Sequence, residues 1–160
     1  MKDWLIIDGY NLLHQIWPVF QKSDIPRLRK DILLRIEPLV NAIARRVTVV
    51  FDGNQHGNDT SKADECEVIE VIYSPAGSSA DSVIEKLVWK AGQPEDILVV
   101  TSDRLIRDAV SARGADTMAS SLFVSALEEQ TANLSEKIRK LNKHNTNITL
   151  SDFFPPLRND

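Results

Sequence analysis

The chain of 160 residues has almost no cysteine: Cys66 stands alone and cannot form a disulfide within the chain. Unpaired thiols are usual in a reducing compartment, so we expect a cytoplasmic protein. No run of about 18 apolar residues occurs, so we expect no transmembrane helix and no membrane partner. The first residues lead directly into a candidate strand without the apolar segment of a signal peptide, which agrees with this expectation.

Several catalytic motifs are also missing. After the first candidate strand, the segment Asp8-Gly9-Tyr10-Asn11 has neither the dinucleotide-binding glycine pattern nor the lysine of a P-loop. No G-x-S-x-G serine elbow occurs. An aspartyl-phosphate enzyme would normally have a second acid where this chain has Tyr10, and a lysine near 101–103. The sequence therefore argues against these classes.

Histidine is scarce as well. His14, His56 and His144 have no spacing that pairs them with one another or with Cys66. A zinc site is therefore not expected, and we interpret each histidine as an ordinary surface or turn residue.

Charge is distributed unevenly along the chain. The net charge of −4 argues against a simple nucleic-acid binder. Residues 22–46 and 137–144 are each locally basic, whereas residues 52–67 are locally acidic. From charge alone, we interpret these charged segments as helix faces that are exposed to solvent. Basic helices beside an acidic site would also suit a metal-dependent nuclease.

Short apolar runs at 4–7, 47–51 and 97–102 are rich in β-branched and aliphatic residues. Such runs are typical of strands that are buried on both faces of a parallel sheet. Further strands are predicted at 68–73 and 116–119, and helices at about 26–43, 79–91, 104–113 and 121–142. This alternation predicts an α/β fold, a three-layer α/β/α sandwich with a central, mostly parallel sheet. We assign residues 1–145 to this domain and 146–160 to a C-terminal tail.

Prolines and glycines predict where the helices begin and end. Pro26 suits the first turn of its helix, whereas Pro38 predicts a kink or a division that moves Glu37 out of the α-helical region. Gly92 and Gly114 are predicted to end the two helices that precede them.

Four aspartates stand at the ends of predicted elements. Asp8, Asp52 and Asp103 follow apolar runs, and Asp81 opens a helix. In open α/β sheets, ligands bind outside the carboxyl ends of the strands, so we expect these acids at one edge. Each also has a structural explanation, because the first two precede glycine in turn dipeptides and the other two stand at helix starts.

Several carboxylates gathered at one edge favour a divalent cation. Mg²⁺ or Mn²⁺ takes hard oxygen ligands, and either one or two ions would fit such a set. Two ions can activate water and stabilise the leaving oxygen of a phosphodiester. The helix starts at Asp81 and Asp103 would present positive dipole ends to phosphate.

The segment Asp8-Gly9-Tyr10-Asn11 resembles the opening motif of NYN domains, a branch of the PIN-like nuclease superfamily. The closer resemblance is to the YacP-like family, over about residues 3–130, and it rests on residues 49–52, 70–74, 79–87 and 101–103. It implies a sheet of order 3-2-1-4-5. It also implies a metal-dependent endoribonuclease that acts on mRNA and, in some members, associates with the ribosome.

The resemblance also implies roles for individual residues. Asp8, Asp81 and Asp103 would be the catalytic, metal-binding carboxylates, Asn11 would line the site, and Asp52 would bind the metal directly or through water. Glu85 lies one helical turn after Asp81, where it could reach the same edge or form a surface ion pair. Residues 14–17 are larger than is usual in the family, so we expect a different entrance to the site.

The leading hypothesis is an endoribonuclease for single-stranded RNA that uses metal-activated water. The basic segments 22–46 and 137–144 would hold the RNA backbone. The candidate phosphate contacts are Arg104, Lys86, Lys22 and Arg27. The alternatives are a non-catalytic module that binds RNA or the ribosome, and a 5′-nuclease-like activity on DNA. The oligomeric state is left open.

Overall fold

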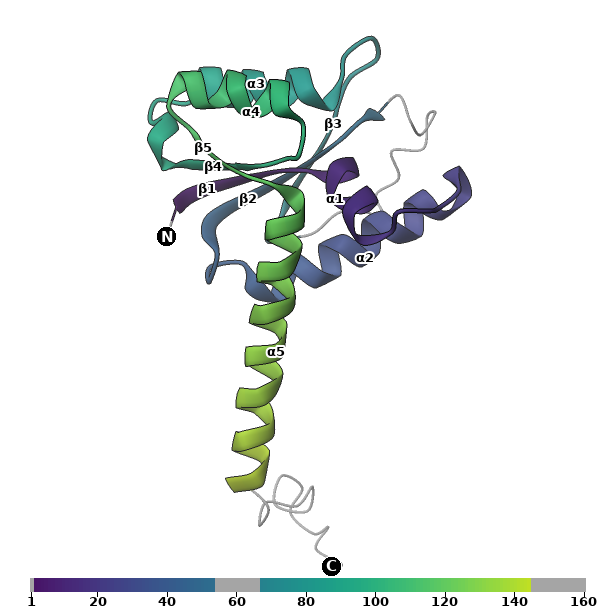
Figure 1. Ribbon diagram of the computed structural model, residues 1–160, viewed down its shortest axis with the longest axis vertical. Helices are drawn as coiled ribbons and strands as arrows, with labels where there is room; N and C mark the ends of the chain where they lie inside the picture. Colours follow the sequence, from purple (N-terminus) through teal and green to yellow (C-terminus); the bar gives the residue numbers. More distant parts are fainter. Residues whose placement is uncertain (1, 54–66, 145–160) are drawn as a thin grey trace, which may run out of the picture. The chain divides into compact units, whose positions relative to one another are not determined.

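A computed structural model of the chain describes residues 2–53 and 67–144, with side chains as far as residue 141 (Figure 1). The strands are β1 (Lys2–Asp8), β2 (Ala44–Phe51), β3 (Glu70–Tyr73), β4 (Ile97–Val100) and β5 (Asp116–Met118). The helices are α1 (Gly9–Ile16), α2 (Ile25–Ile36), α3 (Ala80–Lys90), α4 (Arg104–Arg113) and α5 (Ser120–His144). Short 3₁₀ helices lie at η1 (Lys22–Asp24), η2 (Glu37–Leu39) and η5 (Pro94–Asp96).

The five strands form one sheet of order β3-β2-β1-β4-β5. Every described pairing is parallel. Both the fold class and the strand order implied by the family resemblance are therefore confirmed. The register aligns Asp8 with Val50, and Phe51 with Tyr73, so the carboxyl ends of these strands finish at one edge.

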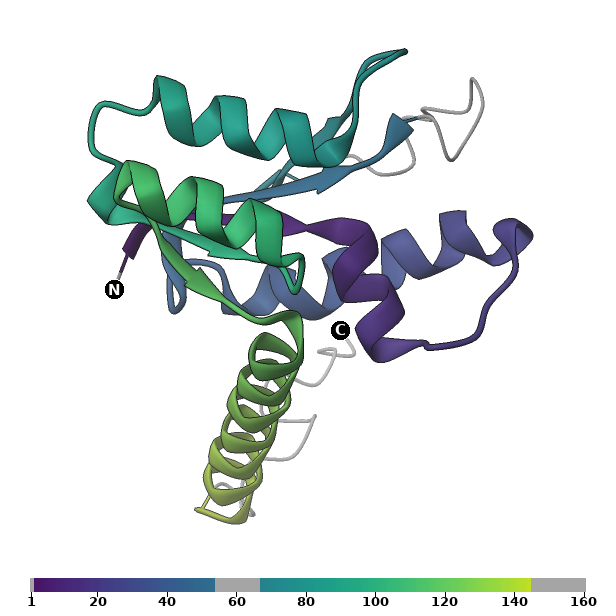
Figure 2. The same cartoon turned by 45° about the horizontal axis from the view of Figure 1, so that its top comes forward.

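Helices cover both faces of this sheet, as the two views in Figures 1 and 2 show. Helices α3 and α4 pack on one face, where their apolar side chains join a buried cluster that contains Ile6 and Val99. Helices α1 and α2 and the first turns of α5 pack on the other face, around Leu5 and Ile7. The three-layer sandwich follows from this division.

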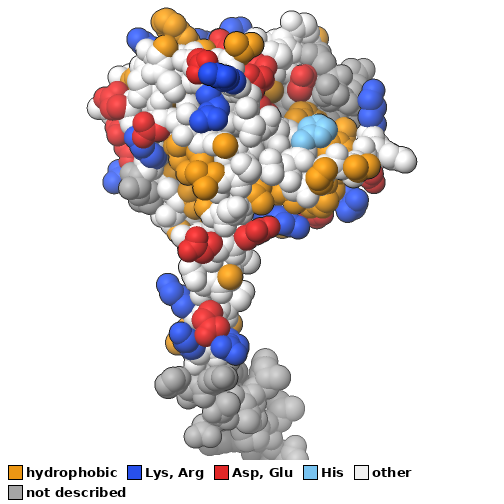
Figure 3. Space-filling model, in the orientation of Figure 1, with side chains coloured by type: hydrophobic (Ala, Val, Ile, Leu, Met, Phe, Trp, Pro, Cys, Tyr) orange, Lys and Arg blue, Asp and Glu red, His pale blue; other side chains and the backbone are white. Residues whose placement is uncertain are grey.

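The outer surface is mixed in character. On the face drawn in Figure 3, Lys and Arg side chains are scattered among acidic and uncharged ones, and hydrophobic side chains form patches between them. A search of the helices in the described part of the chain found none that is both long and apolar enough to cross a membrane.

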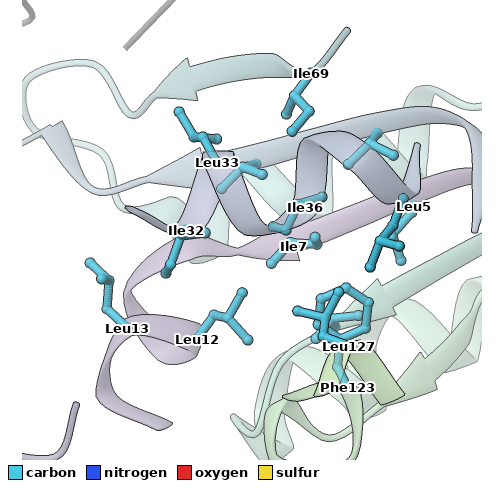
Figure 4. Close-up of a cluster of buried hydrophobic side chains, with 14 of the residues drawn as sticks. Leu5, Ile7, Leu12, Leu13, Ile32, Leu33, Ile36, Ile69, Phe123 and Leu127 are labelled. Atoms are coloured by element: carbon cyan, nitrogen blue, oxygen red, sulfur yellow. The ribbon is translucent and has the colours of Figure 1, made fainter. Parts of the chain in front are cut away.

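Strand β1 shows why this sequence places its sheet in the middle. Leu5, Ile6 and Ile7 are all completely buried, and successive side chains point to opposite faces. Figure 4 shows Leu5 and Ile7 on the face shared with Ile32 and Ile36 of α2. Burying one such side chain contributes about 1.5–3 kcal/mol, so an uninterrupted apolar run is stable only between two helical layers.

The ends of the helices match the sequence in part. Helix α4 ends at Gly114, whose φ of 112° needs a glycine, as predicted. Glu37, in contrast, keeps helical angles (φ −49°, ψ −47°), so the prediction that Pro38 displaces it was wrong. Pro38 lies in the first turn of η2, where its missing N–H costs no hydrogen bond. Gly92 does not cap α3 in a left-handed conformation, because the helix already ends at an extended Ala91.

The chain divides into two compact units, Met1–Leu127 and Glu128–Asp160. The residues of helix α5 are divided between the two units. The predicted tail at 146–160 and residues 54–66 lie outside the described residues, so the boundary after residue 145 stays a prediction.

Candidate active site at the carboxyl edge of the sheet

A cavity of about 350 Å³ opens at the carboxyl edge of the sheet. All four predicted acids line it, although they come from four different places in the sequence. Its described lining consists of Asp8, Tyr10, Asn11, His14, Phe20, Lys22, Ile25, Asp52, Ala80, Asp81 and Asp103. The sheet therefore gathers the acids and Asn11 as the sequence predicted, while the roles of these residues stay predictions.

Asp8 is held at the junction between β1 and α1. It is the last residue of the strand and the N-cap of the helix, and its Oδ1 accepts a hydrogen bond from the Asn11 backbone N–H at 3.3 Å. Its Oδ2 accepts a second bond from the Thr101 hydroxyl at 3.2 Å. Helix α1 begins directly at Gly9, so Asp8 stands at the point where the strand passes into the helix.

Thr101 joins two of the acids. Its hydroxyl donates to Asp8 and also accepts from the backbone N–H of Asp103 at 3.1 Å. Asp103 is the N-cap of α4, and its Oδ1 accepts from the backbone N–H groups of Leu105 (2.9 Å) and Ile106 (3.4 Å). These bonds fix Asp103 against the end of β4 and leave its other carboxylate oxygen outside the cap.

Asn11 organises the loop that carries Asp103. Its side-chain oxygen accepts from the Ser102 backbone N–H at 2.8 Å and from the Ser120 hydroxyl at 2.6 Å. Ser120 also donates its own backbone N–H to the Ser102 hydroxyl. Because its oxygen is already used twice, Asn11 has its amide N–H₂ as the group that can donate to a substrate.

Asp52 follows β2, and its Oδ1 accepts a hydrogen bond from the hydroxyl of buried Ser74 at 3.2 Å. The same hydroxyl accepts from the backbone N–H of Gly53 at 3.0 Å. Ser74 itself follows β3, so neighbouring strand ends hold this acid in place.

The carboxylates shift one another's pKa values. Burial, with further contributions from Asp81 and Asp103, raises the pKa of Asp8 from 3.8 to about 6, against hydrogen bonds that lower it. Burial and the charges of Asp103, Glu85 and Asp52 raise the pKa of Asp81. Among the described residues, no ion pair involves Asp8, Asp81 or Asp103. The cavity therefore favours a positive charge.

A comparison with protein families matches residues 5–153 to the YacP-like NYN domain. The chain belongs to this family. YacP-like NYN domains are part of a nuclease family, and the acids of this chain lie at the edge of the sheet where a parallel α/β domain binds its ligand.

Two crystal structures of Rae1 (YacP) from Bacillus subtilis are similar to this YacP-like chain. One is 26% identical, with a TM-score of 0.73, and the match covers 90% of this chain and 84% of Rae1. The other, of a mutant, is 25% identical with a TM-score of 0.72, and covers 88% and 84%. A search of curated protein sequences found no significant match.

The donor set of this YacP-like site fits a hydrated divalent ion. No group of three His, Cys, Asp or Glu side chains within residues 2–53 and 67–141 is arranged to hold a metal ion. Mg²⁺, however, usually keeps several waters and takes only one or two carboxylates directly. The carboxylates of Asp8 and Asp81, whose pKa values are raised by burial and by neighbouring carboxylates, would be stabilised by such an ion.

Only one of the four basic residues proposed to bind RNA lines the cavity of this YacP-like domain, and that residue is Lys22. Lys86 and Arg104 are exposed but are not among its described lining residues. Arg27 forms exposed ion pairs with Asp24 of η1 (3.6 Å) and with Asp31 of α2 (3.8 Å), and its proposed contact with RNA stays a prediction.

The basic residues of 22–46 do not all lie on one surface, and the proposed role of this segment in holding RNA stays a prediction. Arg29 is 1% exposed, and its guanidinium lies over the ring of Tyr73 at 5.2 Å, so it belongs to the core. Arg45 and Arg46 lie on β2 near its amino end and pair with Asp3 and Glu70. Figure 3 likewise shows basic side chains dispersed rather than gathered on the face it draws. The segment is basic in sequence, but in the folded protein its charged side chains lie in different parts of the structure.

Sequence reasoning placed residues 14–17 at the entrance of the site but gave His14 itself no role there, and it missed Phe20. Both line the cavity, and their rings lie 4.7 Å apart between centroids. His14 is three residues after Asn11 on α1, so the helical period alone placed it on the same face, a signal that went unused. No helical period could place Phe20 in the same way, because it follows an irregular segment.

Replacing Asp8 with asparagine is expected to make the metal-free protein more stable at neutral pH. The pKa of Asp8 is raised on folding, so its contribution to stability is present below about pH 4 and is lost as the pH rises through about 6. Asparagine is also a good N-cap. Urea unfolding in EDTA should therefore show the variant gaining roughly 2 kcal/mol over wild type between pH 4 and pH 7.5. An equal difference at both pH values would contradict the raised pKa.

Proposed function

We propose that this protein is a metal-dependent endoribonuclease that hydrolyses phosphodiester bonds of single-stranded RNA with Mg²⁺ or Mn²⁺. One observation carries the proposal: four aspartates from separate parts of the chain line one cavity, in a member of a nuclease family. A binding module gains nothing from such a set, because carboxylates repel the phosphates of RNA.

Asp8, Asp81 and Asp103, with Asp52 directly or through water, would hold the ion. Bound there, the ion would lower the pKa of a water and neutralise charge on the phosphate. None of the described lining residues is a serine or a cysteine, so the nucleophile we propose is water and no covalent intermediate is needed.

The residues of the chain position the reacting groups. Thr101 and the N-cap of α1 keep Asp8 at the end of β1, and Asn11 keeps the loop before α4 in place. The N-terminal ends of α3 and α4 would add positive dipole ends on the side of the phosphate. Lys22 supplies a positive charge for the RNA backbone.

The substrate we propose is RNA, including mRNA, because the chain belongs to a family of ribonuclease type. Association with the ribosome, which the family resemblance implies for some members, stays a prediction, as does a cytoplasmic location. A single-stranded DNA of the same sequence is the control that tests whether the protein prefers ribose to deoxyribose.

The test is incubation of the purified protein with end-labelled single-stranded RNA in Mn²⁺ and, in parallel, in EDTA. We expect internal cuts in Mn²⁺, none in EDTA, and weaker cutting of the matching DNA. Cutting in EDTA, or equal cutting of DNA, would contradict the proposal.

Thermal unfolding separates the enzyme from a non-catalytic RNA-binding module. An ion that binds only the folded state at 100 times its Kd adds about 2.7 kcal/mol, which raises the Tm of a domain of this size by roughly 5–10 °C. No response of the Tm to Mn²⁺, together with no cleavage, would favour the binding module.

A further inference from the structure

Part of the cavity lining carries no carboxylate. It is formed by the end of α1 and the segment that follows, where His14, Phe20 and Lys22 come together. The rings of His14 and Phe20 are 4.7 Å apart between centroids and tilted by 37°. His14 is exposed and Phe20 is partly exposed, so aromatic surface in this pair remains accessible.

The third aromatic residue of the lining, Tyr10, has a different place. Its ring meets the buried ring of Phe51 edge-on at 5.6 Å, and it packs against the main core. Phe20 is partly buried and packs against the same core, whereas His14 is exposed. The core therefore accounts for Tyr10 and for part of Phe20, but an exposed ring at His14, stacked against Phe20 beside a group of acids, requires another explanation.

We propose that His14 and Phe20 form a nucleobase subsite, in which a base next to the cleaved phosphate stacks on the ring pair while Lys22 contacts the backbone. The inference rests on the proposed function, and it adds how the substrate is held. Only an unpaired, unstacked base can enter such a site, so the subsite selects single-stranded RNA over a duplex.

Electrostatics explains why the site needs stacking. Four aspartates line the cavity against one lysine, so the phosphates of RNA are repelled before an ion binds. Stacking of a base on an aromatic ring does not depend on the phosphate charge, and it tolerates any base. The aromatic pair therefore supplies affinity that the acidic lining cannot.

The test is the fluorescence of a short single-stranded RNA that contains 2-aminopurine, whose emission falls when the base stacks. Binding is measured in EDTA at low salt, where the proposed reaction does not occur. We expect the protein to quench the probe, and His14→Ala and Phe20→Ala to weaken binding by ~10-fold or more. His14→Phe keeps an aromatic ring and should bind within about 3-fold of wild type.

Trp89→Ala is the matched control, because Trp89 is an exposed aromatic residue on α3 that does not line the cavity. It should leave both quenching and affinity unchanged. Wild-type quenching in His14→Ala would overturn the subsite. So would binding that is retained by His14→Gln and lost in His14→Phe, because that pattern indicates a hydrogen bond in place of stacking.

Cleavage in Mn²⁺, measured on the same variants, separates this inference from the proposed function. If the wild-type protein cleaves RNA and His14→Ala does not change the quenching, the proposed nuclease function is supported and the proposed subsite is wrong. If the quenching depends on His14 but no cleavage occurs in Mn²⁺ or Mg²⁺, the subsite is supported as an RNA-binding site and the proposed nuclease function is wrong.

Discussion

Asp81→Asn is expected to reduce Mn²⁺-dependent RNA cleavage by about 1,000-fold while the protein stays folded. The carboxylate lies in the first turn of α3 and lines the cavity with the other acids. An amide holds a divalent cation far less well, and the ion stabilises the transition state by several kcal/mol, with a factor of ten for each 1.36 kcal/mol. Initial rates on labelled RNA, at saturating Mn²⁺, measure the loss.

Folding of this variant can be checked independently, because burial and the other carboxylates raise the pKa of Asp81. Removing its charge relieves repulsion, so the metal-free variant should melt at or above the temperature of wild type at pH 7.5. Asp108→Asn is the matched control, an exposed acid on α4 outside the described lining, and it should cleave at the wild-type rate. Undiminished cleavage by pure Asp81→Asn would remove Asp81 from the proposed site.

Gly9→Ala is expected to destabilise the fold by about 2–3 kcal/mol, which lowers the Tm by roughly 5–10 °C. A Cβ at this position would overlap the ring of Phe51, which is completely buried, and would lie 3.0 Å from the backbone oxygen of Val50. The β1–α1 junction would have to shift, and Asp8 would shift with it. Urea or thermal unfolding measures the first effect, and RNA cleavage measures the second.

Gly92→Ala provides the comparison within the same chain. A Cβ at Gly92 would meet no atom within 4 Å, and the backbone there does not need a glycine. This variant should be as stable as wild type or more stable by up to about 1 kcal/mol, because alanine restricts the unfolded chain. Equal stability of the two alanine variants would show that the β1–α1 junction is more tolerant than its packing indicates.

The sheet and its acidic edge were predictable because both depend on local patterns. Runs such as 4–7 and 47–51 identify buried parallel strands, and parallel strands bring the residues that follow them to one edge. Asp8 and Asp52 are therefore located by their positions along the chain. The strand order came from the family resemblance, since strand patterns alone do not fix it.

The contacts that complete the site depend on residues far apart in the sequence. Nothing near Asn11 indicates that its side chain accepts a hydrogen bond from Ser120, 109 residues later. Thr101 looked like part of a strand, although its hydroxyl links two acids. Arg29 looked like surface charge until the fold placed it over Tyr73, a contact that depends on two distant elements meeting.

The bond between Asn11 and Ser120 also sets when the site can form during synthesis. The ribosome adds Asp8 and Asn11 well before it adds Asp103 and Ser120. A nascent chain therefore holds part of the acidic edge without the residues that fix it. The proposed site therefore cannot be complete until residue 120 has been added and has folded back against Asn11.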